Sequence, residues 1–424
     1  MKLNKAKITY FGLPRSVYII FIARVVNSMG NFVFPFMTLL LTQKGGMQEQ
    51  EVGKFLLMGS LLQLPGSLIG GKLTDLMGRK KIMILFMGLA AFCYLPSALF
   101  IDNPDTFHYV PYLLILSSFF GSVAHPASGA MMNDLTVPEN RQAAFSLLYM
   151  GMNAGTAIGS VVAGLLFRKY MKLLFLGDAI TTLISILLLA KFVKETKPTK
   201  EEFNKIKDER VGEKAETGGL LAALLHRPAL LIFAVLDTIY SFIYAQTNFS
   251  LPLKANAVFG EVLGPSYYGT LNMVNCLEVI FFTTIITLIT RKIRAIYNVS
   301  IAGLFYAIGF GMLFFVDSFW LFAISTIIWT VGEIITATNI GVYIADHTPI
   351  THRGRFNSII SIISSTGGSI SPYFTGKFIQ RYGVNNVWPF MFLLAVVASF
   401  LMFLLGTREK VRKRSLSSAV GQGE

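Results

Sequence analysis

The hydrophobic residues of this chain fall into long runs, which are separated by short polar or basic stretches. Leu173–Ala190, Ile301–Phe315 and Phe390–Leu405 are examples. A helix needs about 20 apolar residues to cross the hydrocarbon layer of a bilayer, whereas strands of an outer-membrane barrel alternate polar and apolar positions. The pattern therefore predicts an all-α polytopic membrane protein. Twelve spans can be placed, near residues 16–42, 52–76, 80–101, 109–133, 141–167, 173–194, 228–251, 266–290, 295–316, 318–345, 356–380 and 386–407.

Composition argues against a water-soluble protein. Hydrophobic residues make up 53% of the 424 positions and charged residues only 14%, against about 25% charged in an average soluble domain. The net charge of +14 could indicate a nucleic-acid binder, but most Lys and Arg fall on one side of the predicted spans, with a local exception at Arg168, Lys169 and Lys172. This asymmetry follows the positive-inside rule. It predicts a cell-membrane protein with both termini in the cytoplasm and no nucleic-acid partner.

Residues that would carry enzymatic or metal chemistry are missing from the sequence pattern. Cys93 and Cys276 both fall inside predicted spans, so they indicate neither a disulfide framework nor a thiolate metal site. No His, Cys and acid cluster has metal-ligand spacing, and no phosphate loop or nucleophile elbow occurs. Residues 1–15 precede a span too long for a signal-peptide core, so no cleavage is expected. We therefore expect no enzyme, no cofactor and no metal.

The chain is organised as two repeated halves. The polar stretch 195–227 predicts a cytoplasmic linker between an N-terminal six-helix bundle, residues 1–194, and a C-terminal one with a basic tail, residues 228–424. The segment Asp134–Arg141 joins two spans, and Asp346–Arg353 does the same 212 residues later. Such self-similarity indicates duplication. Parallel membrane repeats of this kind place a substrate cavity between their halves near the bilayer midplane.

The most specific motif is the loop between spans two and three, Gly71-Lys-Leu-Thr-Asp75-Leu-Met-Gly78-Arg79-Lys80-Lys81. Its glycines permit a tight turn and close helix approach, and Asp75 can pair with Arg79 or with a helix N-terminus. A generic basic turn is the alternative. The loop resembles the signature loop of the major facilitator superfamily, and the resemblance extends over the whole chain. It implies a twelve-helix transporter with two pseudo-symmetric bundles. The implied gating residues are Gly71, Asp75, Gly78, Arg79 and Lys80.

The loop's counterpart in the second half keeps only its basic residues. Around Thr287–Arg294 the sequence retains Arg291, Lys292 and Arg294. We therefore do not expect a second acidic latch there.

Small residues line one face of the fifth span, at Asn153, Gly155, Gly159 and Gly164. Such a face favours close helix packing, and packing alone is one interpretation. The pattern also resembles the antiporter motif of drug/proton exchangers in this superfamily. Ser160 replaces the Pro usual in that motif, while a Pro occurs in the other half at Pro372. The Arg that the family often carries in span four is absent, and Arg24 in span one is the available substitute.

Ionisable groups inside spans give the strongest indication of function, because each costs about 2.5–3.5 kcal/mol to insert at a helix centre. Glu333, Asp237, Glu278 and Arg24 are the candidates for substrate and proton coupling. Glu333 and Asp237 resemble the acidic pair of certain multidrug/proton antiporters. The alternative is a protonated acid in a packing hydrogen bond. Asp178 is interpreted as a helix-end group.

Further polar groups could line the cavity. One of them, His125, precedes Pro126 at a predicted kink, although a structural histidine is the alternative. The candidates are Asn27, Asn31, Gln63, His125, Tyr240, Tyr244, Gln246 and Asn339.

These features predict a monomeric secondary transporter that exports lipophilic, cationic small molecules in exchange for protons. Its partners would be the substrate, protons and the lipid bilayer. One alternative is a transporter of a single metabolite, such as a sugar, peptide, siderophore or lipid precursor, held by Arg24, Asn27, Asn31 and Gln63. Another is a membrane receptor or assembly factor without transport activity, against which the charged loop around Asp75 argues.

Overall fold

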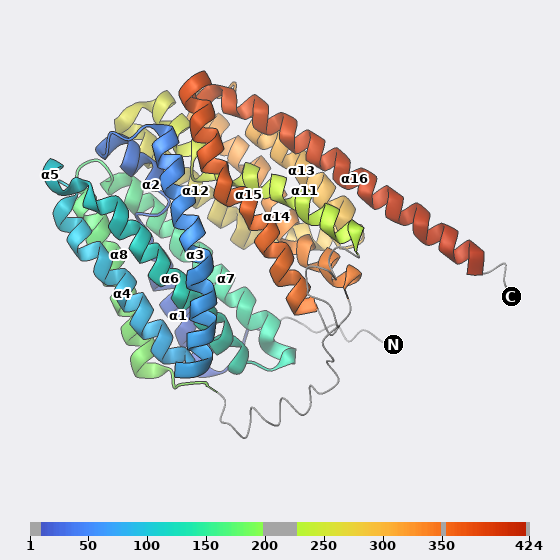
Figure 1. Cartoon of the computed structure of the whole chain (residues 1–424), viewed down its shortest axis with the longest axis horizontal. Helices are drawn as coiled ribbons and strands as arrows, with labels where there is room; N and C mark the ends of the chain where they lie inside the picture. The colour runs from blue at the N-terminus through green and yellow to red at the C-terminus, as the bar shows by residue number, and fades with distance from the viewer. Residues whose placement is uncertain (1–9, 198–226, 349–352, 421–424) are drawn as a thin grey trace. The chain divides into compact units, whose positions relative to one another are not determined.

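The computed structural model describes residues 10–197, 227–348 and 353–420, and every regular element in these ranges is helical (Figure 1). Twelve of the described helices have 15 residues or more. They are α1 (Arg15–Met29), α3 (Glu49–Met77), α4 (Arg79–Phe100), α6 (Tyr109–Asp134), α7 (Pro138–Leu166), α8 (Met171–Phe192), α11 (Pro228–Tyr244), α12 (Ser250–Thr290), α13 (Ala295–Met312), α14 (Phe319–His347), α15 (Arg353–Tyr382) and α16 (Val387–Val420). The shorter ones are α2 (Met37–Leu39), η1 (Leu40–Lys44), α5 (Pro104–Phe107), η2 (Ala245–Thr247) and η4 (Val384–Asn386). Nine segments of the described ranges are long and apolar enough to cross a membrane.

The chain forms two compact units. The first comprises Met1–Arg210 with Ala255–Ile280, and the second comprises Val211–Lys254 with Phe281–Glu424. The sequence assigned all residues from 228 onward to the second bundle, so the grouping of Ala255–Ile280 differs from the prediction. Most of the predicted linker lies outside the described residues.

Close backbone contact explains why part of α12 groups with the first unit. The Ser266 hydroxyl donates to the Gly164 carbonyl of α7 at 3.1 Å. A Cβ added at Gly164 would lie 2.7 Å from the Pro265 carbonyl oxygen, and one at Gly269 would lie 2.2 Å from the Ser160 carbonyl oxygen. Only glycine permits this approach of two helix backbones.

The helices of the two units pack in the same pattern. In the first unit α1 packs on α7 and α8, and α4 packs on α6 and α8. In the second unit α11 packs on α15 and α16, and α13 packs on α14 and α16. Helices α1, α4, α6, α7 and α8 therefore correspond to α11, α13, α14, α15 and α16. The duplication seen in the sequence extends to the packing of the helices.

The first predicted span, 16–42, is discontinuous. Helix α1 ends at Met29, and the chain regains a helical form only at Met37. The backbone N–H groups of Phe32 and Val33 donate to the Asp178 carboxylate of α8, at 2.9 and 3.2 Å. Asp178 is 3% exposed. Its interpretation as a helix-end group of its own span is therefore wrong, because it replaces the hydrogen-bond acceptors that the broken helix lost, which membrane burial requires.

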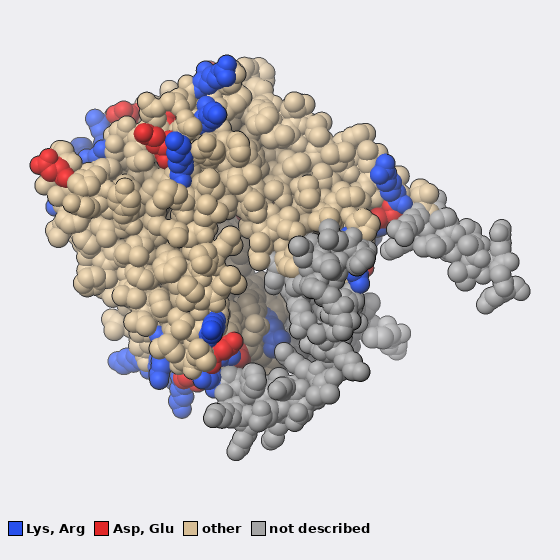
Figure 2. Space-filling view, in the orientation of Figure 1, with Lys and Arg blue, Asp and Glu red and all other residues tan. Residues whose placement is uncertain are grey.

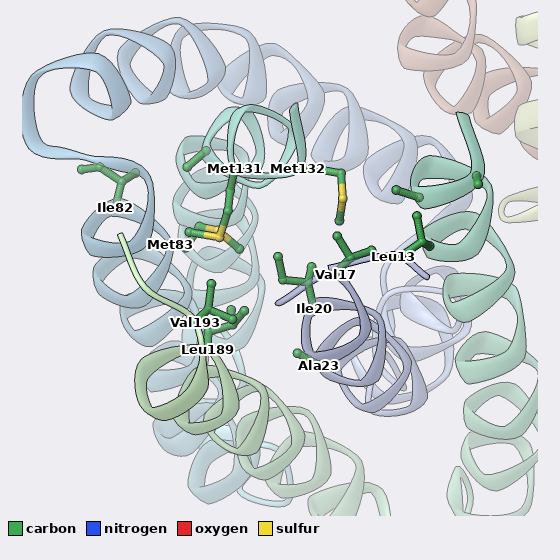
Figure 3. Packing of buried hydrophobic residues seen from close by; sticks show 13 residues of the cluster. Leu13, Val17, Ile20, Ala23, Ile82, Met83, Met131, Met132, Leu189 and Val193 are labelled. Carbon is green, nitrogen blue, oxygen red and sulfur yellow. The ribbon is translucent and has the colours of Figure 1, made fainter. Parts of the chain in front are cut away.

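A hydrophobic cluster joins the five helices α1, α4, α6, α7 and α8 at one end of the first unit (Figure 3). Leu13, just before α1, and Val17, in its first turn, pack in the same cluster as Met131 and Met132, near the end of α6. The other buried members are Ile20, Ala23, Ile82, Met83, Ala127, Ala143, Ala144, Leu189 and Val193. The cluster shows that the start of α1 and the end of α6 lie at the same end of this unit.

Charged side chains of the first unit gather at its two ends. On the face shown in Figure 2, Lys, Arg, Asp and Glu lie near these ends, and the band between them is uncharged. Exposed apolar residues such as Leu68, Phe92 and Leu187 belong to helices that cross this band. An uncharged apolar band is the surface that a bilayer interior requires.

Candidate functional site

Two acids of the second unit share one tyrosine. Asp237 of α11 is 5% exposed, whereas Glu333 of α14 is partly exposed. The side chain of Tyr306, on α13, lies within electrostatic range of both carboxyl groups. The Ser364 hydroxyl of α15 lies beside Asp237 without regular hydrogen-bond geometry. Four helices thus bring two acids and two hydroxyls into one neighbourhood, which we call the acidic cluster.

Aromatic rings form a wall beside the acidic cluster. Tyr306 contacts the rings of Tyr240 and Tyr244, with centroids 5.7 and 6.4 Å apart. Trp329 lies edge-on to Tyr244 at 6.0 Å and stacks on Phe310 at 5.5 Å. Trp329 is one helical turn before Glu333 on α14, so the two side chains share a face. Aromatic faces next to carboxylates suit an organic cation.

Sequence reasoning found four members of this neighbourhood and missed four. Asp237, Glu333, Tyr240 and Tyr244 were predicted. Tyr306, Ser364, Trp329 and Phe310 were not, because the sequence alone does not show which helix faces meet the two acids. The four-residue spacing between Trp329 and Glu333 is the signal that could have found the tryptophan.

The other two coupling candidates lie in the first unit. Glu278 belongs to Ala255–Ile280 and is 8% exposed. Arg24, halfway along α1, is partly exposed, and its guanidinium donates to the Met152 sulfur at 3.4 Å. His125 of α6 is exposed and lies within electrostatic range of Arg24.

Several predicted cavity residues instead hold helices together. The Gln246 amide donates to Ser371 and Thr375 of α15, at 2.6 and 3.0 Å. Asn339 accepts a hydrogen bond from Asn298 of α13 at 2.8 Å. For both side chains the assignment to the cavity gives way to a packing role, because their polar atoms are satisfied inside the second unit.

Of the remaining predicted polar residues of the first unit, three form hydrogen bonds within the unit and one is exposed. Asn27 donates to Thr182 of α8 at 3.1 Å, and Gln63 donates to Ser118 of α6 at 2.9 Å. Asn153 donates to the Tyr149 carbonyl of its own helix at 3.0 Å. Asn31, which follows the end of α1, is exposed. Asn31 is therefore the exposed member of this set.

The small residues of α7 form a seam with α1. A Cβ added at Gly155 or at Gly159 would lie 2.4 Å from the Val25 or the Met29 carbonyl oxygen, respectively. This geometry supports the packing interpretation of the fifth span. Pro372 lies within α15.

The loop between α3 and α4 forms a charged network, the Arg79 cluster, at one end of the first unit. Arg79 pairs with Asp134 of α6 at 2.9 Å, and more loosely with the exposed Asp75 at 3.5 Å. The Glu195 carboxylate accepts the backbone N–H groups of Arg79 and Lys80, at 2.8 and 3.1 Å. Asp134 rather than Asp75 is therefore the close partner of Arg79. Glu195 was missed because it begins the polar stretch taken as linker.

Gly78 makes room for this arrangement. Its φ of 105° lies in the region that favours glycine, and a Cβ there would meet the Glu195 carboxylate oxygen at 2.5 Å. Partial burial acts to raise the pKa of Glu195. Hydrogen bonds from four backbone N–H groups outweigh burial and hold that pKa below its ordinary value. Lys80 donates to the Ala190 carbonyl at 2.6 Å, which ties the loop to α8.

An equivalent network, the Arg294 cluster, occurs in the second unit. The Glu409 carboxylate of α16 pairs with Arg294 at 3.0 Å, accepts the Tyr343 hydroxyl at 2.5 Å and lies 3.3 Å from His347 Nε2. The prediction of no second acidic latch considered only the loop 287–294. The acid comes instead from the far end of the sequence, which spacing within the loop could not reveal.

Comparison with known proteins agrees with this architecture. The sequence profile of the Major Facilitator Superfamily matches residues 20–372 and 263–422. An uncharacterised MFS-type transporter of Bacillus subtilis (strain 168), YttB, is 22% identical over 96% of this chain and 99% of its own. A Na(+), Li(+), K(+)/H(+) antiporter of Planococcus maritimus is 23% identical over 82% of this chain and 85% of its own.

A multidrug resistance protein of Proteus mirabilis (strain HI4320), MdtH, is 29% identical, but only over 45% of this chain and 48% of its own. Among solved structures, a POT family transporter in complex with a thioalcohol-conjugated peptide superposes with a TM-score of 0.75. The two chains are 14% identical, and the match covers 94% of this chain and 97% of that one. The chain belongs to the Major Facilitator Superfamily, whose members are secondary transporters of small molecules.

Proposed function

We propose that the protein is a proton-coupled exporter of lipophilic, cationic small molecules, with the acidic cluster as its coupling site. The observation that carries this proposal is the meeting of Asp237 and Glu333 at Tyr306, beside an aromatic wall that includes Trp329. A carboxyl group in a membrane interior is stable either as a neutral acid or paired with a cation. Protons and cationic substrates therefore compete for the same two groups.

This competition gives a mechanism of exchange. A substrate cation binds the carboxylates and contacts the aromatic faces. Protonation from the outer side neutralises the acids, removes the electrostatic attraction and releases the substrate. The neutral acids then allow the emptied carrier to return without a buried charge, as alternating access requires.

Two relatives agree with this proposal by name. One is a Na(+), Li(+), K(+)/H(+) antiporter, and the other is the multidrug resistance protein MdtH. Their identities of 23% and 29% leave the substrate of this chain to experiment. A transporter of one specific metabolite is the alternative that the same experiment addresses.

The test uses the purified full chain in proteoliposomes under an imposed pH gradient, with dye movement and internal pH followed together. Glu333→Gln keeps the size and hydrogen bonding of the side chain but removes its charge. We expect it to lower transport of a fluorescent cationic dye by about tenfold or more and to abolish substrate-linked proton movement. Asp317→Asn, an exposed acid of the same unit, is the matched control and should transport normally.

Unchanged proton-coupled dye transport in Glu333→Gln would contradict the proposal. A wild-type protein that moves no cationic dye, but moves one metabolite with protons, would favour the alternative.

We place the protein in the cell membrane with the Arg79 cluster on the cytoplasmic side, because the basic loops gather there. Single cysteines at Lys81 and Asp105, both exposed, test this orientation in a background without Cys93 and Cys276. An impermeant maleimide added outside should label only position 105, and labelling of position 81 instead would reverse the orientation.

A further inference from the structure

Arg24 carries a permanent charge in the interior of the first unit. The residue is nine positions after the start of α1 and therefore about 14 Å from that end of the helix. This is close to the middle of a hydrocarbon layer about 30 Å thick. An arginine side chain does not lose its proton in proteins, so the charge must be balanced by another group.

No acid of the described residues supplies that balance. The only described hydrogen bond of the Arg24 guanidinium goes to the Met152 thioether, at 3.4 Å, and a sulfur of this kind is a weak acceptor. Within the described ranges no carboxylate lies within 4.0 Å of Arg24. The acid on the neighbouring helix α8, Asp178, accepts the backbone N–H groups of Phe32 and Val33 instead.

A second nitrogen-bearing side chain lies within electrostatic range of Arg24. His125 is nine positions before the end of α6, so it matches Arg24 in depth, because these two helix ends meet in the hydrophobic cluster of Figure 3. The imidazole is exposed and within electrostatic range of the guanidinium. Within the described part of the chain the structure gives it no hydrogen bond. Both side chains therefore have donors to offer to a bound group.

We infer that Arg24, with His125 at a similar depth and within its electrostatic range, forms a binding subsite for the carboxylate of an amphiphilic small molecule. The planar guanidinium presents a fork of N–H donors that matches the two oxygens of a carboxylate. One guanidinium balances one negative charge, which favours a carboxylate over a dianionic phosphate. The partly exposed Arg24 and the exposed His125 leave the site accessible, and the apolar residues of α1 around it suit a hydrophobic tail.

This subsite is formed by other residues than the acidic cluster. Two ligands that differ only in their charged group can therefore test the two sites separately. Isothermal titration calorimetry of the purified full chain in detergent would compare 4-butylbenzoate with 4-butylbenzylammonium, which share ring and tail but differ in charge. We expect Arg24→Gln to weaken benzoate binding by about tenfold or more and to leave ammonium binding unchanged. Glu333→Gln should have the reverse effect. Met152→Leu, which removes only the thioether, should bind both ligands as the wild type does.

The stability of the ligand-free protein distinguishes a binding role from a structural one. If Arg24 serves a ligand, Arg24→Gln removes an unbalanced charge, and its melting temperature should equal or exceed that of the wild type. A structural arginine would give a lower one. Should the Gln variant not fold, Arg24→Lys decides, because lysine keeps the charge but lacks the fork and should bind benzoate several-fold more weakly. Benzoate binding that is absent from the wild type, or unchanged in the Arg24 variants, overturns the inference.

Discussion

The Arg79 and Arg294 clusters occupy equivalent places in the two units but are built from different donors. In each, an arginine next to the start of a helix contacts an acid. Glu195, which follows α8, accepts the Arg79 backbone N–H, and Glu409, within α16, pairs with the Arg294 side chain. Glu195 is held by backbone N–H groups. Glu409 is held by the side chains of Arg294, Tyr343 and His347.

The two kinds of donor differ in whether they can move or change protonation. Backbone N–H groups do not titrate, and two of the four that Glu195 accepts belong to the start of α4 and move only with that helix. The pKa of Glu195 is held below its ordinary value, so its contribution to stability is present above the ordinary pKa of a glutamate and is lost as pH falls through the lowered folded-state pKa. Side-chain donors depend on rotamer and, for histidine, on protonation. Both units therefore have a charged network at equivalent places, and only the Arg294 cluster, of these two, contains a histidine.

The largest effect should follow removal of the Glu409 charge. Glu409→Gln leaves Arg294 and His347 facing a neutral amide, at a position whose carboxylate side chain is 10% exposed. We expect the free energy of unfolding to fall by about 2 kcal/mol. Thermal denaturation of the detergent-solubilised protein, followed by tryptophan fluorescence, measures it. Glu195→Gln, at the exposed counterpart, should lower the free energy of unfolding by less. Equal losses in the two variants would contradict the proposed difference between the two clusters.

A smaller effect should separate the two acids that surround Arg79. Asp134 lies 2.9 Å from the guanidinium and its side chain is 20% exposed, whereas Asp75 lies at 3.5 Å and is 79% exposed. We therefore expect Asp134→Asn to lower stability by about 1 kcal/mol and Asp75→Asn by less than about 0.5 kcal/mol. The same denaturation assay applies, in low and high salt, because screening should reduce the Asp134 effect. If Asp75→Asn is the more destabilising change, the distances do not describe the network in solution.

Much of the fold could be predicted from the sequence, because crossing a membrane demands long apolar runs and leaves few charges to explain. The same scarcity pointed to Asp237 and Glu333. The break after Met29 could not be predicted, since the group that stabilises it, Asp178, lies far away in the sequence and reaches it only through helix packing.

The environment of the candidate site was harder to predict for the same reason. A polar residue within a span can face a solute or another helix, and the sequence does not distinguish the two. Gln246 and Asn339 proved to bond to neighbouring helices. Glu409 looked like part of a basic tail, and only the packing of α13 against α16 brings it to Arg294.

The smallest expected effect is a pH dependence that only the Arg294 cluster should show. His347 Nδ1 lies 2.8 Å from the Tyr343 carbonyl oxygen, and Nε2 lies 3.3 Å from the Glu409 carboxylate. Both partners are acceptors, so only the doubly protonated imidazolium can donate to both. Among the charged groups of the described residues, Arg294 donates to the other oxygen of the Glu409 carboxylate, and Arg227 donates to the His347 carbonyl.

Deprotonation of His347 should therefore remove one hydrogen bond and one attraction as pH rises through the range where histidine titrates. We expect the wild type to be about 0.5–1 kcal/mol more stable at pH 6 than at pH 8, and His347→Gln to lose most of this difference. Glu195→Gln should retain it, because Glu195 stays ionised across this range. Melting temperatures at both pH values measure the effect, and a His347→Gln variant with the full wild-type difference would show that the titrating group lies elsewhere.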